Sequence, residues 1–209
     1  MAKIGTDIEY AAALLRQGKL VGIPTETVYG LAGNAFDLHA IARIFEVKQR
    51  PQNVPFIAQT DSMEKVQGWT KDFPLEATML AKKYWPGALT LILEKTDLIP
   101  DSMTNGGNSV GVRIPHHSMT LELLSKLDFP LAVPSANVHG QKSPVTAQEV
   151  NDMIGGEIEY ILDGGTCEVG FESTIIGFDG NDPVLFRQGA LDIGELESVI
   201  NKKIKRTKA

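Results

Sequence analysis

Three segments of the chain place hydroxyl or cationic side chains beside glycine or proline, where backbone and side chain together could hold an anion. Residues 24–31 read Pro-Thr-Glu-Thr-Val-Tyr-Gly-Leu, residues 48–51 read Lys-Gln-Arg-Pro, and residues 134–137 read Pro-Ser-Ala-Asn. Hydroxyls position phosphate oxygens through hydrogen bonds, and fixed cations neutralise their charge. Each segment alone is a weak signal, and together they point to a phosphate or carboxylate site.

Lys48 and Arg50 have the clearest geometry of these residues. Pro51 disfavours a helical conformation at Arg50, so a helix that contains Lys48 should end near Gln49. On an extended exit from that helix, Lys48 and Arg50 would face the same side and could clamp a phosphate or carboxylate. The alternative is that they are ordinary cations near a helix C-terminus.

Two further arginines lie at the end of, or within, apolar segments that read as strands. Arg113 interrupts residues 110–115, and an unpaired charge there would be very costly, so Arg113 must be paired or face a cavity. Arg187 ends the strand expected at residues 184–186. Ser173 stands at the entrance of another strand. Residues 134–137 have a typical turn composition, which competes with a role in presenting a hydroxyl and an amide to a nucleotide.

Several familiar chemistries lack their motifs. The four histidines, His39, His116, His117 and His139, show no spacing typical of a metal site. No phosphate-binding loop of the Walker type, dinucleotide fingerprint or serine-hydrolase elbow occurs. Cys167 is the single cysteine, which excludes an intrachain disulfide, favours a reducing compartment and fits a small buried hydrophobe better than a nucleophile.

Composition predicts a soluble, cytoplasmic protein with one core. The chain has 209 residues, of which 43% are apolar, and its net charge of −6 argues against a general nucleic-acid coat. It shows neither a signal-peptide pattern nor an apolar run long enough to cross a membrane. Residues 202–209 hold five basic residues and no acidic one. We expect a domain at 1–201 and a basic tail at 202–209, either frayed in solvent or in contact with RNA or a partner.

Helical and strand patterns alternate along the chain. Residues 6–9 form a capping-box pattern that opens a helix ending at Gly18, and Asp37 should cap a second helix. Further helices are expected at residues 75–84, 118–126, 146–154 and 193–200. Strands are expected at residues 20–23, 89–93, 110–114, 131–133, 160–162, 173–178 and 184–186. This order predicts an α/β fold with a twisted mixed sheet flanked by helices, in which loops after strands carry the polar motifs.

The same motifs, in this order, resemble those of the YrdC-like domain, the catalytic domain of threonylcarbamoyl-AMP synthases. Four further segments are similar to family segments: residues 85–90 (Trp-Pro-Gly-Ala-Leu-Thr), 112–115, 172–174 and 185–189. The resemblance covers roughly residues 8–200, and the chain looks like the short, single-domain form.

The resemblance implies a reaction among L-threonine, bicarbonate and ATP. The products would be threonylcarbamoyl-adenylate and pyrophosphate, and other proteins would pass the carbamoyl group to an adenosine beside the anticodon of certain tRNAs. A tRNA or a tRNA-modifying complex is therefore the implied partner. Mg²⁺ would enter on the ATP phosphates, with no metal site of the protein's own. Such a transfer needs positioning and charge neutralisation more than a protein nucleophile.

The resemblance also assigns roles to residues of this sequence. Thr27 and Ser173 would contact L-threonine, and Arg113 would bind its carboxylate. Lys48 and Arg50 would neutralise the ATP phosphates and the developing charge, which makes them the catalytic residues. The predicted ATP-binding set is Lys48, Arg50, Ser109, Ser135, Asn137, Ser143 and Arg187.

The chain departs from the family pattern at three positions. Val54 and Gln59 stand where the family typically has an asparagine and a substrate-contacting histidine, and Gln188 replaces a proline. Glutamine can hydrogen-bond but does not titrate near neutral pH. Two alternatives therefore stay open: a related enzyme that makes another carbamoyl-adenylate, and a non-catalytic RNA-binding module of the same fold that uses the basic tail.

Overall fold

The strands form one mixed sheet. In the computed structural model, which describes residues 1–51 and 54–206, eleven strands lie in the order β1-β8-β2-β3-β7-β4-β6-β5-β9-β10-β11. Parallel pairs such as β4/β6 and β5/β9 adjoin antiparallel pairs such as β2/β3 and β5/β6. The strands are β1 Lys3–Gly5, β2 Val21–Ile23, β3 Gly30–Asn34, β4 Ile57–Gln59, β5 Leu89–Glu94, β6 Ser109–Arg113, β7 Leu131–Ala132, β8 Tyr160–Leu162, β9 Thr174–Asp179, β10 Asp182–Arg187 and β11 Lys205–Arg206. The predicted α/β fold is confirmed.

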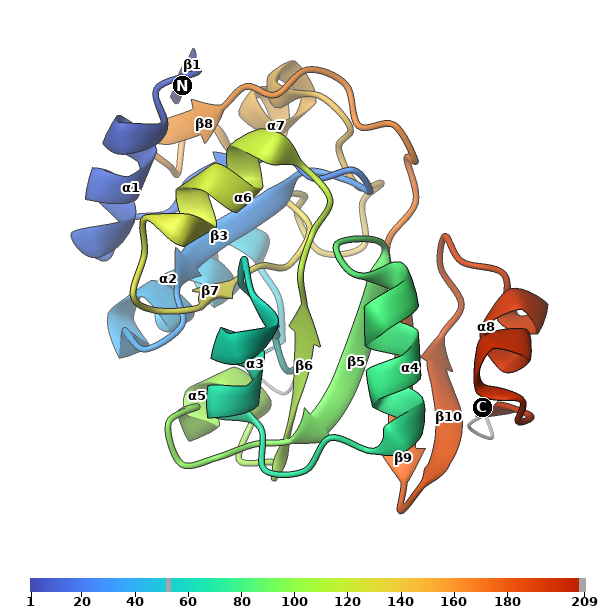
Figure 1. The fold of residues 1–209 in the computed structure, drawn as a ribbon. Helices are drawn as coiled ribbons and strands as arrows, with labels where there is room; N and C mark the ends of the chain where they lie inside the picture. Colours follow the sequence, from blue (N-terminus) through green and yellow to red (C-terminus); the bar gives the residue numbers. More distant parts are fainter. Residues whose placement is uncertain (52–53, 207–209) are drawn as a thin grey trace.

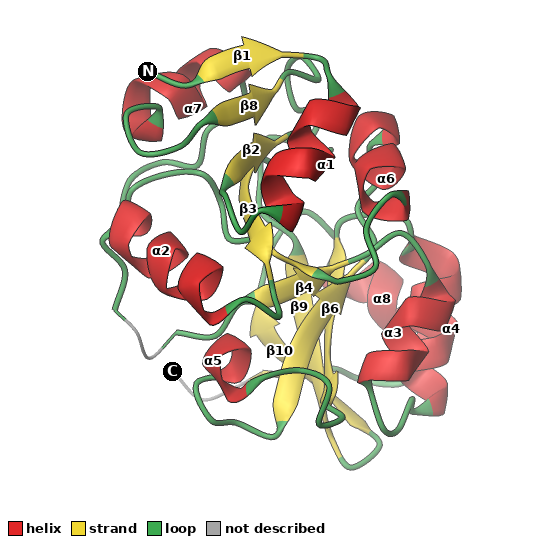
Figure 2. Cartoon of the chain, turned by 90° about the vertical axis from the view of Figure 1, so that its left-hand side faces the viewer, coloured by secondary structure: helices red, strands yellow, loops and turns green. Residues whose placement is uncertain are grey.

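Helices cover both faces of this sheet. The helices are α1 Ile8–Arg16, α2 Leu38–Lys48, α3 Met63–Trp69, α4 Leu75–Tyr84, α5 Asp101–Thr104, α6 Ser118–Ser125, α7 Ala147–Ile154 and α8 Ile193–Ile200. Figure 1 shows their arrangement around the strands, and Figure 2 shows α2, α5 and α7 on one side of the sheet with α3, α4 and α6 on the other. Because both faces are covered, β2 and β8 are buried along their whole length and apolar rather than alternating.

The predicted helices are confirmed, with one corrected cap. The helices at residues 75–84 and 193–200 have the predicted bounds, and Asp37 caps α2 as expected. The capping-box pattern placed the cap of the first helix at Thr6, but the cap is Asp7, whose carboxylate accepts a hydrogen bond from the Tyr10 amide at 2.9 Å. A carboxylate at this position also interacts favourably with the positive end of the helix dipole.

Four strands and two helices have no counterpart in the sequence prediction: β1, β3, β4, β11, α3 and α5. β3 is glycine-rich, a composition that local propensity assigns to turns. A Cβ atom on Gly33 would lie 3.1 Å from the Ile44 side chain of α2, so glycine here permits the close packing of α2 on the sheet. β4 contains only three residues, too few for a clear periodicity.

Residues 202–206 pack against the body of the protein. β11 pairs with β10, and the Ile204 side chain is buried. The Lys202 ammonium lies 2.9 Å from an Asp182 carboxylate oxygen, and Lys203 lies 2.6 Å from Glu197. Lys205 lies 2.6 Å from Asp182, so the three lysines of this segment pair with acidic residues of the body.

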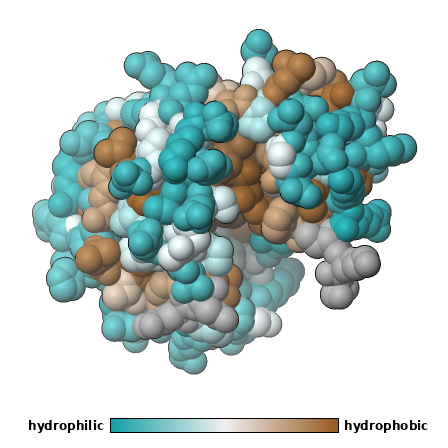
Figure 3. Space-filling model, turned by 90° about the horizontal axis from the view of Figure 1, so that it is seen from below, coloured by the Kyte–Doolittle hydropathy of each residue, from teal (hydrophilic) through white to brown (hydrophobic). Residues whose placement is uncertain are grey.

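Two further observations concern the surface of the molecule and the length of its helices. Seen from below, the molecule has an apolar hollow between two hydrophilic rims (Figure 3). No helix in the described part of the chain combines the length and apolar character that a membrane crossing requires.

Candidate active site

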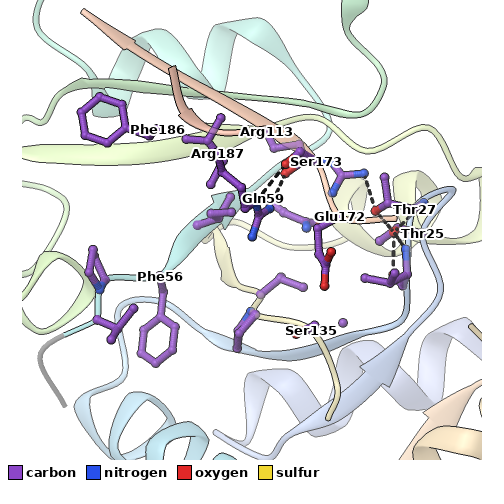
Figure 4. A pocket seen from close by; sticks show the side chains of 18 of the residues that line it. Thr25, Thr27, Phe56, Gln59, Arg113, Ser135, Glu172, Ser173, Phe186 and Arg187 are labelled. Atoms are coloured by element: carbon purple, nitrogen blue, oxygen red, sulfur yellow. Dashed lines mark hydrogen bonds between the residues drawn. The ribbon is translucent and has the colours of Figure 1, made fainter. Parts of the chain in front are cut away.

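A cavity of about 400 Å³ opens where the ends of several strands meet. Its walls come from the β2–β3 connection, the segment after α2, the ends of β4, β6 and β10, the loop after β7 and the start of β9. Figure 4 shows the side chains that face it. Six predicted site residues line this cavity together: Thr27, Arg50, Arg113, Ser135, Ser173 and Arg187.

The hydroxyls of Thr25 and Thr27 contact each other at one wall of the cavity. The Thr25 hydroxyl donates to the Val28 carbonyl at 2.7 Å and lies 2.8 Å from the Thr27 hydroxyl. Thr25 Oγ1 also accepts hydrogen bonds from the Thr27 and Val28 amides, each at 3.2 Å, so either hydroxyl can be the donor between Thr25 and Thr27. Thr27 Oγ1 also accepts a hydrogen bond from Arg113 at 2.9 Å. Contacts with Thr25 and Arg113 thus hold the Thr27 hydroxyl at the wall of the cavity.

Arg113, at the end of β6, is both paired and directed toward the cavity, as its sequence context requires. Its side chain is 5% exposed, and its Nη2 lies 2.8 Å from Glu26 Oε1 and 2.9 Å from Thr27 Oγ1. Its Nε donates to the Gly87 carbonyl at 3.0 Å. Burial lowers the pKa of Arg113, and the Glu26 carboxylate acts in the opposite direction. Glu26 thus fixes the charge and orientation of this guanidinium.

Ser173 and Arg187 form the opposite wall. Arg187 donates from Nε to the Ser173 carbonyl at 3.0 Å and from Nη2 to the Ser173 hydroxyl at 3.1 Å. The Ser173 hydroxyl also lies 2.8 Å from the hydroxyl of Thr90. The register of β9 and β10 shifts between Leu185 and Arg187. A bulge of this kind re-aims side chains, and Arg187 faces the cavity.

Arg50 reaches the cavity from the end of α2. Its Nη2 donates to the Pro55 carbonyl at 3.2 Å, and its guanidinium carbon lies 5.3 Å from the centre of the Phe56 ring. Burial lowers the pKa of Arg50, and the charge of Arg187 lowers it further. Two guanidiniums that weaken each other's protonation indicate a local excess of positive charge.

Lys48 does not have the position that was predicted from an extended exit of the helix. Gln49 adopts a left-handed conformation with φ of 49°, so Lys48 and Arg50 do not project side by side. The Lys48 ammonium is buried and donates to the backbone carbonyls of Ser135 and Asn137, the latter at 2.7 Å. Lys48 does not line the cavity but holds the loop that forms its wall. Its contact with a phosphate stays a prediction.

Ser135 lines the cavity, whereas Asn137 and Ser143 lie behind its walls. The Asn137 amide donates to the carbonyls of Val138 and Gln141, and its Oδ1 is buried without a partner among the described residues. The Ser143 hydroxyl donates to Glu172, which does face the cavity.

Ser109 lies at the far end of β6 from Arg113 and is exposed. It borders a second hollow of about 840 Å³ rather than the first cavity. The two hollows share Ile92 and Phe186 in their walls. An elongated ligand would be needed to contact Ser109 and Arg113 together.

Sequence reasoning missed two acidic residues of the site and left Gln59 without an assigned role. Glu26 lies inside the first motif, and Glu172 lies directly before Ser173. Their positions next to predicted site residues could have indicated that they belong to the site. Gln59 lines the cavity, is 3% exposed, and has an Oε1 atom without a hydrogen-bond partner among the described residues. A buried polar atom of this kind normally has a partner, and a ligand could supply it.

The electrostatics of the cavity favour an anion. Arg50, Arg113 and Arg187 line it, and Glu26 pairs with Arg113 from behind. Guanidiniums offer paired N–H donors that match carboxylate and phosphate oxygens. Across the described residues, no group of three or more histidine, cysteine or acidic side chains is placed to hold a metal.

The fold and the cavity define the class: an α/β protein whose cavity at the strand ends is lined by three arginines. The Sua5/YciO/YrdC family model, described as "Telomere recombination", matches residues 13–189. The chain belongs to this family.

Relatives in this family carry the name threonylcarbamoyl-AMP synthase. One from Pyrococcus abyssi is 46% identical over 93% of this chain and 57% of its own length, and one from Bacillus subtilis is 41% identical over 92% and 56%. The crystal structure of P. abyssi Sua5 complexed with L-threonine superposes with a TM-score of 0.94 at 43% identity, covering 99% of this chain and 62% of that one. The chain thus spans a little over half the length of these curated relatives.

Proposed function

We propose that the protein is an L-threonylcarbamoyladenylate synthase, a nucleotidyltransferase that acts on L-threonine, bicarbonate and MgATP. The observation that carries this proposal is the gathering of six predicted substrate residues around one cavity. The L-threonine complex of the similar Sua5 structure and the names of the curated relatives support it.

The proposed reaction has two steps. The threonine ammonium and bicarbonate form a carbamate with release of one water and one proton. A carbamate oxygen then attacks the α-phosphorus of ATP, and the bond to pyrophosphate breaks as the new O–P bond forms. Mg²⁺ accompanies ATP on its phosphates. The cavity contributes by holding both substrates in line and by neutralising the charge that develops on the phosphoryl oxygens.

The residues around the cavity suit these roles. Arg113 would bind the threonine carboxylate, with Thr27 and Ser173 beside it. Arg50 and Arg187 would neutralise the phosphates, and Ser135 would contact the nucleotide. Lys48, Asn137 and Ser143 form hydrogen bonds that hold the walls, so they would act on ATP through the backbone or side chains that they support. Ser109 would be reached by a nucleotide that extends into the second hollow.

The wider setting follows from the same proposal. The adenylate product would pass to a tRNA-modifying protein that transfers the threonylcarbamoyl group to adenosine, and the protein would work in the cytoplasm.

Pyrophosphate release tests the proposal directly. The assay contains ATP, Mg²⁺ and bicarbonate, with L-threonine, L-serine or no amino acid. Release that requires both L-threonine and bicarbonate is the expected result. A folded protein that binds ATP but releases no pyrophosphate with L-threonine would refute the synthase assignment.

Gln59 is a specific reason to keep a second acceptor in the assay. Its buried, unpartnered Oε1 is available to a ligand donor, where the family typically has a histidine. If L-serine or another amino acid supports faster release than L-threonine, the protein is a carbamoyl-adenylate enzyme with a different acceptor.

A further inference from the structure

Glu172 places a carboxylate in a cavity that is otherwise lined by cations. It lies two residues before β9 and is half-buried, and Figure 4 shows its carboxylate directed into the space between Ser135 and Ser173. Its Oε1 accepts a hydrogen bond from the Ser143 hydroxyl at 2.5 Å. Its Oε2 has no side-chain partner among the described residues. The Ser143 hydroxyl and the backbone amide of Glu172 itself hold the carboxylate, and its oxygens have acceptor capacity left for a ligand.

The charges around Glu172 determine what it can bind. Arg50, Arg113 and Arg187 line the cavity, and Glu172 is the sole carboxylate among its described lining residues. An ammonium group entering this space is repelled by the guanidiniums of Arg50 and Arg187 and attracted by the carboxylate of Glu172. The Ser143 hydrogen bond lowers the pKa of Glu172, and the charge of Arg187 adds to this effect. Glu172 is therefore ionised at neutral pH.

The neighbouring residues complete a site for a zwitterion. Thr27, whose hydroxyl contacts Thr25 and Arg113, lies at the wall of the same cavity. Arg113, next to Thr27, offers guanidinium donors to a carboxylate. An α-amino acid carries both groups on one carbon atom, so acceptors and a cation in one cavity match its two ends.

We propose that Glu172 is the residue that recognises the ammonium group of the α-amino acid substrate. This inference rests on the proposed function and deepens it, because it explains how a cationic cavity admits a positively charged group. Glu172 would act in substrate binding rather than as a proton acceptor.

The position of Glu172 is well supported by the backbone. Its carbonyl accepts a hydrogen bond from the Ala190 amide at 3.0 Å. A Cβ atom on Gly189 would lie 2.4 Å from that same carbonyl oxygen, so glycine allows the two segments to pack closely. Glutamine at position 172 keeps an oxygen that can accept from Ser143, and E172Q should therefore fold.

The test compares two ligands that differ at a single group. Isothermal titration of L-threonine and of 2,3-dihydroxybutanoate, in which a hydroxyl replaces the ammonium, is carried out with wild type, E172Q and E168Q. Glu168 is an exposed glutamate on the same loop that does not line the cavity, which makes E168Q the matched control. Pyrophosphate release is measured with the same three proteins.

The expected result is a loss of affinity only for the ligand that carries the ammonium group. A hydrogen bond between charged groups corresponds to roughly a 10- to 100-fold change in Kd. E172Q should weaken L-threonine binding by about that factor and change the affinity for 2,3-dihydroxybutanoate less than about twofold, while E168Q resembles wild type. If wild type releases pyrophosphate and E172Q keeps the wild-type preference for L-threonine, the role of Glu172 is overturned. The proposed function is not affected by that result. Wild type that neither binds L-threonine nor releases pyrophosphate overturns the proposed function and this inference with it.

Discussion

Replacement of Glu26 by glutamine should destabilise the protein more than any exposed substitution. Glu26 and Arg113 form an ion pair with side chains 7% and 5% exposed, at 2.8 Å. Glu26 Oε2 also accepts a hydrogen bond from the His116 amide at 3.0 Å. E26Q keeps the shape and this hydrogen bond but removes the charge that balances Arg113.

The magnitude follows from the burial of the pair. Removal of one partner of a buried ion pair costs about 3–5 kcal/mol, because the other charge stays buried without compensation. The Gly87 carbonyl and the cavity still solvate Arg113 in part, so we expect the lower end, about 3 kcal/mol. For a domain of this size, 1 kcal/mol corresponds to a change in Tm of about 2–4 °C, so the expected fall is about 6–12 °C.

Urea unfolding at pH 7 measures this change in the free energy of unfolding. The controls are E168Q, which removes an exposed charge, and the double variant E26Q/R113M, which removes both members of the pair. The double variant should recover part of the loss, since no uncompensated charge remains. Stability of E26Q within about 0.5 kcal/mol of wild type would show that Glu26 does not compensate Arg113.

Three further predictions concern single side chains. R50A should reduce pyrophosphate release by about 100-fold or more with a normal circular dichroism spectrum, because Arg50 faces the cavity and its main polar contact is the Pro55 carbonyl; a fully active R50A protein would contradict its role. Burial lowers the pKa of Lys48 from 10.5 to about 8, so between these pH values the unfolded chain holds a proton that the folded chain does not. The difference between the free energies of unfolding of wild type and K48M should therefore rise with pH in that window, with a limiting slope of about 1.4 kcal/mol per pH unit. A difference that does not change with pH would contradict the burial of the ammonium. Burial raises the pKa of Cys167 to about 11, so iodoacetamide at pH 8 should label the native thiol far more slowly than the thiol of the protein in guanidinium, and equal rates would show that Cys167 is accessible.

The sequence predicted the elements with strong periodicity and missed those held by tertiary contacts. α4 and α8 have clear helical patterns, and their bounds match the prediction. β3 contains two glycines in five residues and has a low intrinsic propensity, yet pairing with both β2 and β7 makes it a central strand. β11 has two residues and owes its conformation to β10. Such elements depend on partners that are distant in the sequence.

The candidate site shows the same division. A charge within an apolar strand predicted that Arg113 is either paired or facing a cavity, and in the structure it is both. The direction of the Lys48 side chain depends on the left-handed conformation of Gln49, which no local sequence pattern predicts. The position of Glu172 in the cavity depends on the approach of Gly189 to its backbone. Residue types were readable from the sequence, whereas side-chain directions required the fold.

The way in which the cations are held has a consequence for the balance between stability and binding. Carbonyl oxygens orient Arg50, Arg187 and the Lys48 ammonium, and the Glu172 carboxylate offsets only part of the charge of Arg187. In the free protein Arg50 is destabilised by Arg187, and Arg187 by Arg113. The unliganded fold therefore contains an internal repulsion that an anionic ligand relieves. Binding of an anion would therefore be thermodynamically coupled to folding, because the repulsion that limits the stability of the empty protein also increases its attraction for an anion.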